Sequence, residues 1–112
     1  MHIGIDIEEI GRFENLLTSK PNLLKKIFFD NEILYSQKKR NPAQTLCGIW
    51  CAKEAVVKAL WDFESLNVNE INILHYKNGV PYVNPIKNFN LSLSISHTDK
   101  YATAVALALK IQ

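Results

Sequence analysis

Two acidic residues near the start of the chain, Asp6 and Glu8 in the segment GIDIE, have the spacing of side chains that share one face of a strand. Acids at a strand end commonly face solvent or cap the next helix, and for this pair alone that is the better interpretation. A third carboxylate, Glu54, lies in the later segment WCAKEAVVKAL. Three hard oxygen ligands suit magnesium, which usually completes its shell with water and substrate phosphates. The three acids are therefore compatible with a metal–phosphate site.

The segment around Glu54 has the periodicity of an amphipathic helix. Steps of about 100° place Lys53, Glu54 and Lys58 on an arc of about 140°. The opposite, apolar face consists of Ile49, Ala52, Ala55, Val56, Ala59 and Leu60. Glu54 and Lys58 also have the favourable i, i+4 order of a surface ion pair, which is the plainer interpretation of this motif when it is taken alone.

Three large apolar residues, Trp50, Val57 and Trp61, fall inside the same charged arc. Exposure to water would leave two aromatic side chains uncovered beside three charges. We therefore expect something to cover them, either a loop of the same chain or a neighbouring subunit.

His97 is the remaining candidate for chemistry. It follows Ser94 and Ser96 at the end of an alternating segment and precedes a predicted turn. A single histidine in such a place is most often a turn residue, so its position alone assigns no function.

Helices are predicted to position these residues in the first half of the chain. The segment HIGID (2–6) has strand character, and EEIGRFENLL (8–17) repeats apolar residues with helical spacing. Pro21 suits the first position of a short helix, and Asp30 suits the cap of another that covers NEILYSQKK. Asn41 and Pro42 begin a long helix, which we expect to run from about residue 42 to about residue 61.

Strands are predicted in the second half. The segments INILHY (71–76), YVN (82–84), LSLSIS (91–96) and YATAVALAL (101–109) have strand patterns, and the Asn-Gly pair of KNGV predicts a hairpin turn. Helices followed by strands predict an α+β fold. We expect an N-terminal strand and helices, one of them long and central, packed on an antiparallel sheet from the C-terminal half.

Composition places few limits on function. The 112 residues fit one domain (1–112), and 47% hydrophobic with 21% charged residues is an ordinary globular balance. A net charge of +2 gives no support for nucleic-acid binding. No leader or membrane-spanning pattern is recognisable, so we expect a cytoplasmic protein. Cys47 and Cys51, one helical turn apart without a second pair, are expected to be reduced, buried core thiols.

Together, the segments GIDIE, WCAKEAVVKAL and SISH, with GVPYV between the second and third, resemble the small holo-acyl-carrier-protein synthase type of phosphopantetheinyl transferase. The resemblance covers essentially the whole chain, and the order and separation of the motifs carry it. It implies that family's fold and magnesium-dependent transfer of 4'-phosphopantetheine from coenzyme A to a serine hydroxyl of an apo acyl carrier protein, with release of adenosine 3',5'-bisphosphate. The alternative is a non-catalytic carrier-protein or nucleotide-binding module that retains the fold.

The resemblance assigns metal ligands residue by residue. Asp6 and Glu54 match the ligands of the magnesium ion, and Glu8 matches an additional acid found in larger members. Either Glu54 or a metal-bound water would take the proton of the attacking serine, and the sequence does not choose between them.

The resemblance also assigns substrate contacts. Lys58 matches a lysine that contacts phosphate, Lys53 is a weaker candidate beside it, and His97 matches a histidine near the nucleotide end of coenzyme A. Arg12 matches an arginine that meets the acidic carrier protein, although an ordinary exposed arginine would look the same. Further basic residues near helix ends either extend that surface or only interact with solvent, and the second is favoured: Lys25, Lys26, Lys38, Lys39 and Arg40.

Finally, the resemblance implies a homotrimer with sites between subunits, in which a neighbour covers the apolar part of the charged arc and contributes His97. The chain departs from the family pattern in two places: Ile49 replaces a common arginine, and the segment Trp61-Asp62-Phe63 replaces a glycine-rich turn. Both fall in the expected coenzyme A region. The loss of a bidentate phosphate donor and of flexible glycines is expected to alter coenzyme A affinity or carrier preference.

Overall fold

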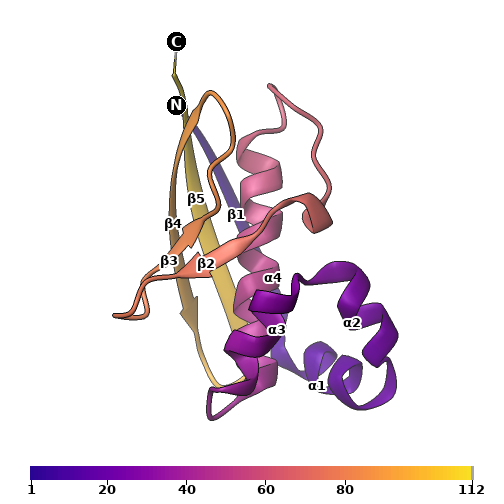
Figure 1. Ribbon diagram of the computed structural model, residues 1–112. Coiled ribbons are helices and arrows are strands. Elements are labelled where there is room, and N and C mark those ends of the chain that lie inside the picture. Colours follow the sequence, from indigo (N-terminus) through magenta and orange to yellow (C-terminus); the bar gives the residue numbers. More distant parts are fainter. Residues whose placement is uncertain (112) are drawn as a thin grey trace.

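The computed structural model describes residues 1–111 and packs helices against antiparallel strands (Figure 1). The helices are α1 (Ile10–Ser19), α2 (Pro21–Ile27), α3 (Asp30–Gln37) and α4 (Pro42–Ala59), with a short 3-10 helix at Val68–Glu70. The strands are β1 (His2–Glu9), β2 (Ile73–His75), β3 (Pro81–Val83), β4 (Phe89–His97) and β5 (Tyr101–Lys110). This arrangement confirms the predicted α+β class. Within residues 1–111, every helix is too short or too polar to cross a membrane.

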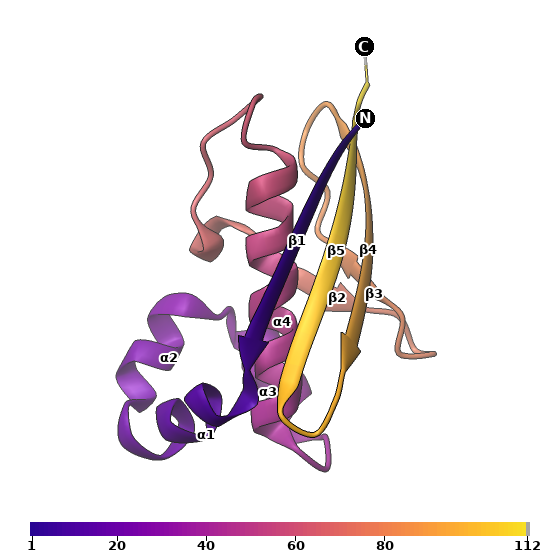
Figure 2. The same cartoon turned by 180° about the vertical axis from the view of Figure 1, so that it is seen from behind.

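The long strands form an antiparallel sheet in the order β1-β5-β4, while β2 and β3 form a separate hairpin. Helix α4 runs along one face of the long sheet (Figures 1 and 2). β1 pairs with β5 along its whole length, from His2 opposite Ala108 to Glu9 opposite Tyr101. The first strand is therefore longer than predicted, and α1 begins at Ile10, because this pairing holds Glu8 and Glu9 in the sheet.

Small residues bring α4 close to the sheet. Alanines alternate along the face of β5 that packs on α4, and all of them are buried: Ala102, Ala104, Ala106 and Ala108. Gly4 of β1 lies against the backbone of α4, where a Cβ atom would come within 1.9 Å of the Ala55 carbonyl oxygen. Only glycine permits this approach. It sets β1, which carries Asp6, directly beside the part of α4 that carries Glu54.

The start of α4 follows the predicted capping pattern. The Asn41 side chain accepts a hydrogen bond from the Gln44 backbone N–H at 3.1 Å, and Pro42 occupies the first turn. The helix ends at Ala59, about one half-turn earlier than predicted. Cys47 and Cys51 within it are buried and unpaired, which confirms the predicted core thiols.

Two apolar surfaces are only partly covered by the chain itself. On α4, Trp50 packs against Phe13 of α1 with ring centroids 6.2 Å apart and Val57 is half-buried, while Trp61, in the turn after the helix, keeps 71% of its surface exposed. The other surface lies on the side of the sheet away from α4. We call it the apolar sheet face, and it comprises Ile3, Ile5, Ile7, Leu107 and Leu109.

Candidate active site

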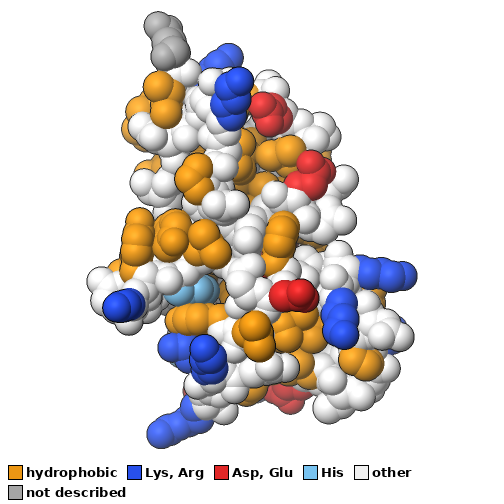
Figure 3. All heavy atoms as spheres, viewed as in Figure 1, with side chains coloured by type: hydrophobic (Ala, Val, Ile, Leu, Met, Phe, Trp, Pro, Cys, Tyr) orange, Lys and Arg blue, Asp and Glu red, His pale blue; other side chains and the backbone are white. Residues whose placement is uncertain are grey.

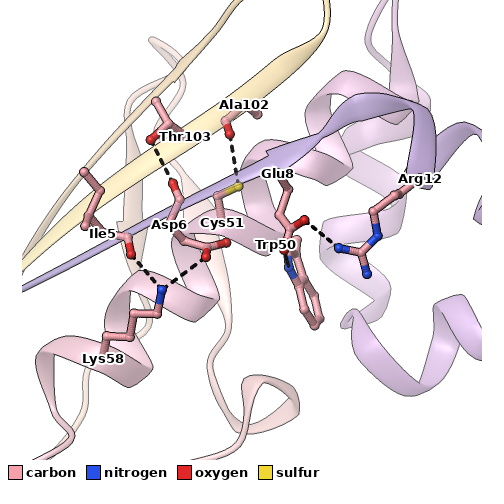
Figure 4. Close-up of polar contacts among 9 residues, drawn as sticks. All are labelled: Ile5, Asp6, Glu8, Arg12, Trp50, Cys51, Lys58, Ala102 and Thr103. Atoms are coloured by element: carbon pink, nitrogen blue, oxygen red, sulfur yellow. Dashed lines mark hydrogen bonds and ion pairs between the residues drawn. The ribbon is translucent and has the colours of Figure 1, made fainter.

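Strand β1 and helix α4 bring Asp6, Glu54 and Lys58 together. The Lys58 ammonium lies 3.3 Å from Asp6 Oδ1 and donates a hydrogen bond to the Ile5 carbonyl oxygen at 3.0 Å (Figure 4). Glu54 lies one turn before Lys58, close enough to Asp6 for the two carboxylates to repel each other. We call these three residues the carboxylate–lysine cluster. All three were selected from the sequence.

The single positive charge of Lys58 does not balance the two carboxylates of this cluster. Asp6 is 12% exposed, and its Oδ2 atom is buried without a hydrogen-bond partner among residues 1–111. Burial raises the pKa of Glu54 above its ordinary value, Asp6 raises it further, and Lys58 opposes the rise. A buried acceptor without a partner is costly, and a small hard cation would both satisfy it and offset the repulsion. The two carboxylates therefore have the donor chemistry that fits magnesium.

Glu8 is engaged elsewhere. Its Oε1 atom accepts a hydrogen bond from Arg12 Nη1 at 2.5 Å, and its Oε2 atom accepts one from the Trp50 indole N–H at 3.4 Å (Figure 4). In the part of the chain that the structure describes, no three His, Cys, Asp or Glu side chains are grouped so that they could hold a metal ion. The structure thus brings Asp6 and Glu54 together but leaves Glu8 with Arg12 and Trp50.

Lys53 lies in the interior, away from the carboxylate–lysine cluster. Its side chain is fully buried, with Nζ 2.6 Å from Glu32 Oε1 and a hydrogen bond of 2.7 Å to the Ile71 carbonyl oxygen. The α3 helix and the chain leading into β2 cover this part of the charged arc. The coenzyme-binding role expected for Lys53 is corrected accordingly, because a fully buried ammonium cannot contact a bound ligand.

His97, at the end of β4, lines a separate pocket of about 550 Å³. We call it the His97 pocket. Its wall includes Tyr35 of α3, Lys39 and Arg40 before α4, Gln44, Thr45, Gly48 and Ile49 of α4, and His75 of β2. In Figure 3, Lys and Arg side chains gather over the segment between α3 and α4, beside hydrophobic surface. Basic, aromatic and apolar groups in one pocket suit a ligand that joins phosphate to an aromatic ring.

Sequence reasoning missed the position of Lys39 and Arg40 in this pocket. These basic residues were noted in the sequence, but they were interpreted as a solvent-exposed helix end. The fold places both of them in the wall that also contains His97. Ile49, where the resemblance leads us to expect an arginine, lines the same pocket. Lys39 and Arg40 supply positive charge to the wall where Ile49 has none.

His75 stacks on Tyr35 in the wall of the pocket, with ring centroids 3.6 Å apart and an angle of 7° between the planes. Burial lowers the pKa of His75 to about 4, and nearby Lys39 contributes to the decrease. The imidazole therefore stays neutral at pH values where an ordinary histidine, with a pKa of about 6.5, is protonated. A neutral ring can remain stacked beside the lysine without charge repulsion.

We expect the His75 ring resonances in an NMR titration to keep their neutral chemical shifts until the pH approaches about 4. Because the folded pKa is below the unfolded one, the stability that neutral His75 contributes is present above the unfolded pKa and is lost as the pH falls through the folded value. Lys39→Gln should raise this pKa, since it removes one of its two causes. Titration of His75 at or above the ordinary value for histidine would contradict the stacked, neutral assignment.

The carboxylate–lysine cluster and the His97 pocket occupy different places. Asp6 belongs to β1 and His97 to β4, the two edge strands of the sheet, with β5 between them. The residues that line the pocket do not include Asp6, Glu54 or Lys58. The cluster and the pocket are therefore built from different residues on the two edge strands and on different parts of α4.

Comparison with known proteins gives matches along nearly the whole chain. Residues 2–106 match a family model described as the 4'-phosphopantetheinyl transferase superfamily. A holo-acyl-carrier-protein synthase of Fusobacterium nucleatum is 37% identical over 96% of this chain and 97% of its own length. One of Clostridium botulinum is 36% identical over 94% of each chain. The crystal structure of the Helicobacter pylori holo-acyl-carrier-protein synthase in complex with coenzyme A is 30% identical, with a TM-score of 0.82 over 96% of this chain and 99% of that one.

Proposed function

The chain belongs to the 4'-phosphopantetheinyl transferase superfamily, and we propose that it is a holo-acyl-carrier-protein synthase. In this reaction the serine hydroxyl of an apo acyl carrier protein attacks the phosphorus of coenzyme A that bears pantetheine. The new phosphodiester joins serine to 4'-phosphopantetheine, and the broken pyrophosphate bond releases adenosine 3',5'-bisphosphate. The observation that carries the proposal is the full-length match to relatives that have this name.

We propose that Asp6 and Glu54 hold magnesium in this site. The partnerless Oδ2 of Asp6 and the repulsion that raises the pKa of Glu54 support this assignment. When bound, the ion would polarise the phosphoryl oxygens of the pyrophosphate. Lys58 is half exposed, so its ammonium can turn from Asp6 to the phosphate and neutralise the charge that develops there. Either Glu54 or a metal-bound water would then accept the serine proton.

The His97 pocket is proposed to hold the nucleotide end of coenzyme A. An imidazole N–H of His97 can donate a hydrogen bond to a phosphate oxygen, and Lys39 and Arg40 line the same wall. The stacked Tyr35 and His75 add an aromatic surface of the kind that a purine ring contacts. The Helicobacter pylori relative of similar fold binds coenzyme A, which supports this use of the pocket.

The function is tested by incubating the protein with coenzyme A, magnesium and an apo acyl carrier protein, and then measuring the carrier's mass. We expect the mass to rise by that of phosphopantetheine on one serine, and EDTA to prevent the rise. Carriers from both fatty-acid and secondary metabolism should be tried, because the chain does not specify one. Binding of coenzyme A without modification of any carrier would instead favour a non-catalytic module.

We also propose that the protein acts as a homotrimer. Two partial sites on one chain support this proposal, because a ring that joins two different faces of each subunit would bring them together three times. The carboxylate–lysine cluster of one subunit would then meet the His97 pocket of the next. The apolar sheet face and Trp61 provide exposed apolar surface that neighbours could cover.

A mixing experiment tests whether the site is shared. Glu54→Ala and His97→Ala proteins, each impaired alone, should regain activity when they are unfolded and refolded together, because some interfaces then pair an intact Glu54 with an intact His97. Random assembly of equal amounts should restore about a quarter of the wild-type sites. Mixing the folded proteins without unfolding is the control. A monomeric mass by light scattering, or no gain on refolding, would rule out the shared site.

A further inference from the structure

Glu8 lies near the proposed metal ligands, but both of its carboxylate oxygens are hydrogen-bonded to other residues. It lies two residues after Asp6, and its position on β1 gives both side chains the same face of the strand. Its charge contributes to the raised pKa of Glu54, so it lies within electrostatic range of that carboxylate. Both of its oxygens, however, are bonded away from the cluster, one to Arg12 and one to Trp50 (Figure 4).

The two restraining residues differ in exposure. The Arg12 side chain is 62% exposed, whereas that of Glu8 is 23% exposed. The guanidinium thus lies at the surface, with further N–H groups available to an incoming acid. Trp50 is half-buried and packs against Phe13, so its indole N–H is restrained more than the Arg12 guanidinium.

We propose that Arg12 and Trp50 are positioning residues that hold Glu8 away from the metal, and that an acidic carrier surface, by pairing with Arg12, releases Glu8 to join Asp6 and Glu54. This inference rests on the proposed function, which supplies the carrier and the ion. Under this proposal, Glu8 joins the metal site only when the carrier protein is bound. The complete site then forms only where a serine is present to react.

The restraint is weak enough to be released. An exposed ion pair of this type changes an equilibrium by a factor of about five or less, and a hydrogen bond of 3.4 Å is long. Because coupling between two ligands is reciprocal, the factor by which the carrier tightens magnesium binding must equal the factor by which magnesium tightens carrier binding.

The first test is calorimetric titration of the protein with magnesium alone, so it requires neither coenzyme A nor activity. Arg12→Gln should bind the ion about twofold to fivefold more tightly than wild type, because Glu8 is freed. Lys20→Gln, which removes an equal charge from an exposed lysine, is the matched control and should leave the affinity unchanged. In a Glu8→Gln background the effect of Arg12→Gln should disappear.

Two outcomes would overturn the proposal. One is an Arg12→Gln protein that binds magnesium no more tightly than wild type. The other is a gain that persists without the Glu8 carboxylate, since it would then come from the loss of positive charge alone. A protein that modifies no carrier but shows the expected magnesium affinities would contradict the proposed function and leave the restraint on Glu8 intact.

The second test follows the indole N–H groups by NMR, where the chain gives two signals, from Trp50 and Trp61. In Arg12→Gln protein, magnesium should shift the Trp50 signal as its bond to Glu8 breaks, while that of Trp61 provides the reference. Trp50→Phe assigns the signal and keeps the aromatic contact with Phe13. In wild type, the same shift should need magnesium and the apo carrier together. A shift with magnesium alone would show that release of Glu8 does not depend on the carrier.

Discussion

Replacing Glu54 with Gln, or Asp6 with Asn, is expected to lower kcat by about 100-fold or more, because each change removes a ligand of the ion that stabilises the transferring phosphoryl group. Both substitutions preserve the size of the side chain, so the close packing of β1 on α4 at Gly4 is retained. The measurement is turnover at saturating coenzyme A and carrier over a range of magnesium concentrations. Near-normal turnover at saturating magnesium would contradict the metal assignment.

The same variants separate catalysis from folding. Burial and the neighbouring Asp6 raise the pKa of Glu54, so the folded protein disfavours its charged form. With a raised folded pKa, the stability contributed by protonated Glu54 is lost as the pH rises through that value. Near neutral pH without magnesium, Glu54→Gln should therefore unfold at the same or a higher urea concentration. Asp30→Asn, an exposed acid in the first turn of α3, should change neither turnover nor stability appreciably.

The sequence predicted elements well wherever local chemistry decides them. The cap formed by Asn41 at the start of α4, and the alternation of buried alanines along β5, depend on neighbouring residues and on one packed face. The end of β1 was harder to predict, because Glu8 and Glu9 are held in the strand by pairing with β5 at the far end of the chain. A pairing between segments far apart in the chain leaves no periodic pattern in the local sequence.

The candidate site divides in the same way. Asp6, Glu54 and Lys58 could be selected because the family motifs and the strand and helix periods agree on them. The environment of Lys53 could not be predicted, because α3 and the entry to β2 cover only one part of the helix face that Lys53 shares with Glu54 and Lys58. The Arg12 and Trp50 contacts of Glu8 escaped prediction for a related reason, since they join a strand to two helices.

The buried pair of Lys53 and Glu32 joins three parts of the fold. The Glu32 carboxylate accepts hydrogen bonds from the backbone N–H groups of Phe29 and Ile73, both at 2.8 Å, in addition to its contact with Lys53. The Lys53 ammonium also lies 4.9 Å from the centre of the Phe29 ring. Removing one partner of such a pair leaves an uncompensated charge in the interior, which typically costs about 3–5 kcal/mol.

Lys53→Met is therefore expected to lower the free energy of unfolding by about 3–5 kcal/mol near pH 8, measured by urea denaturation. Burial raises the pKa of Glu32, and Lys53 is the main group opposing that rise, so the carboxyl of the variant should have a still higher pKa. Stability gained from a raised folded pKa is present at low pH and lost as the pH rises through it, so the deficit of the variant should shrink toward about pH 5.

Adding Glu32→Gln to Lys53→Met removes the uncompensated charge and should recover part of the loss at the higher pH. Recovery should stay incomplete, because the amide has one acceptor oxygen for the two backbone N–H groups that the carboxylate satisfied. A deficit that is equal at both pH values would show that Glu32 does not carry the stranded charge, and the pair would then act through packing alone.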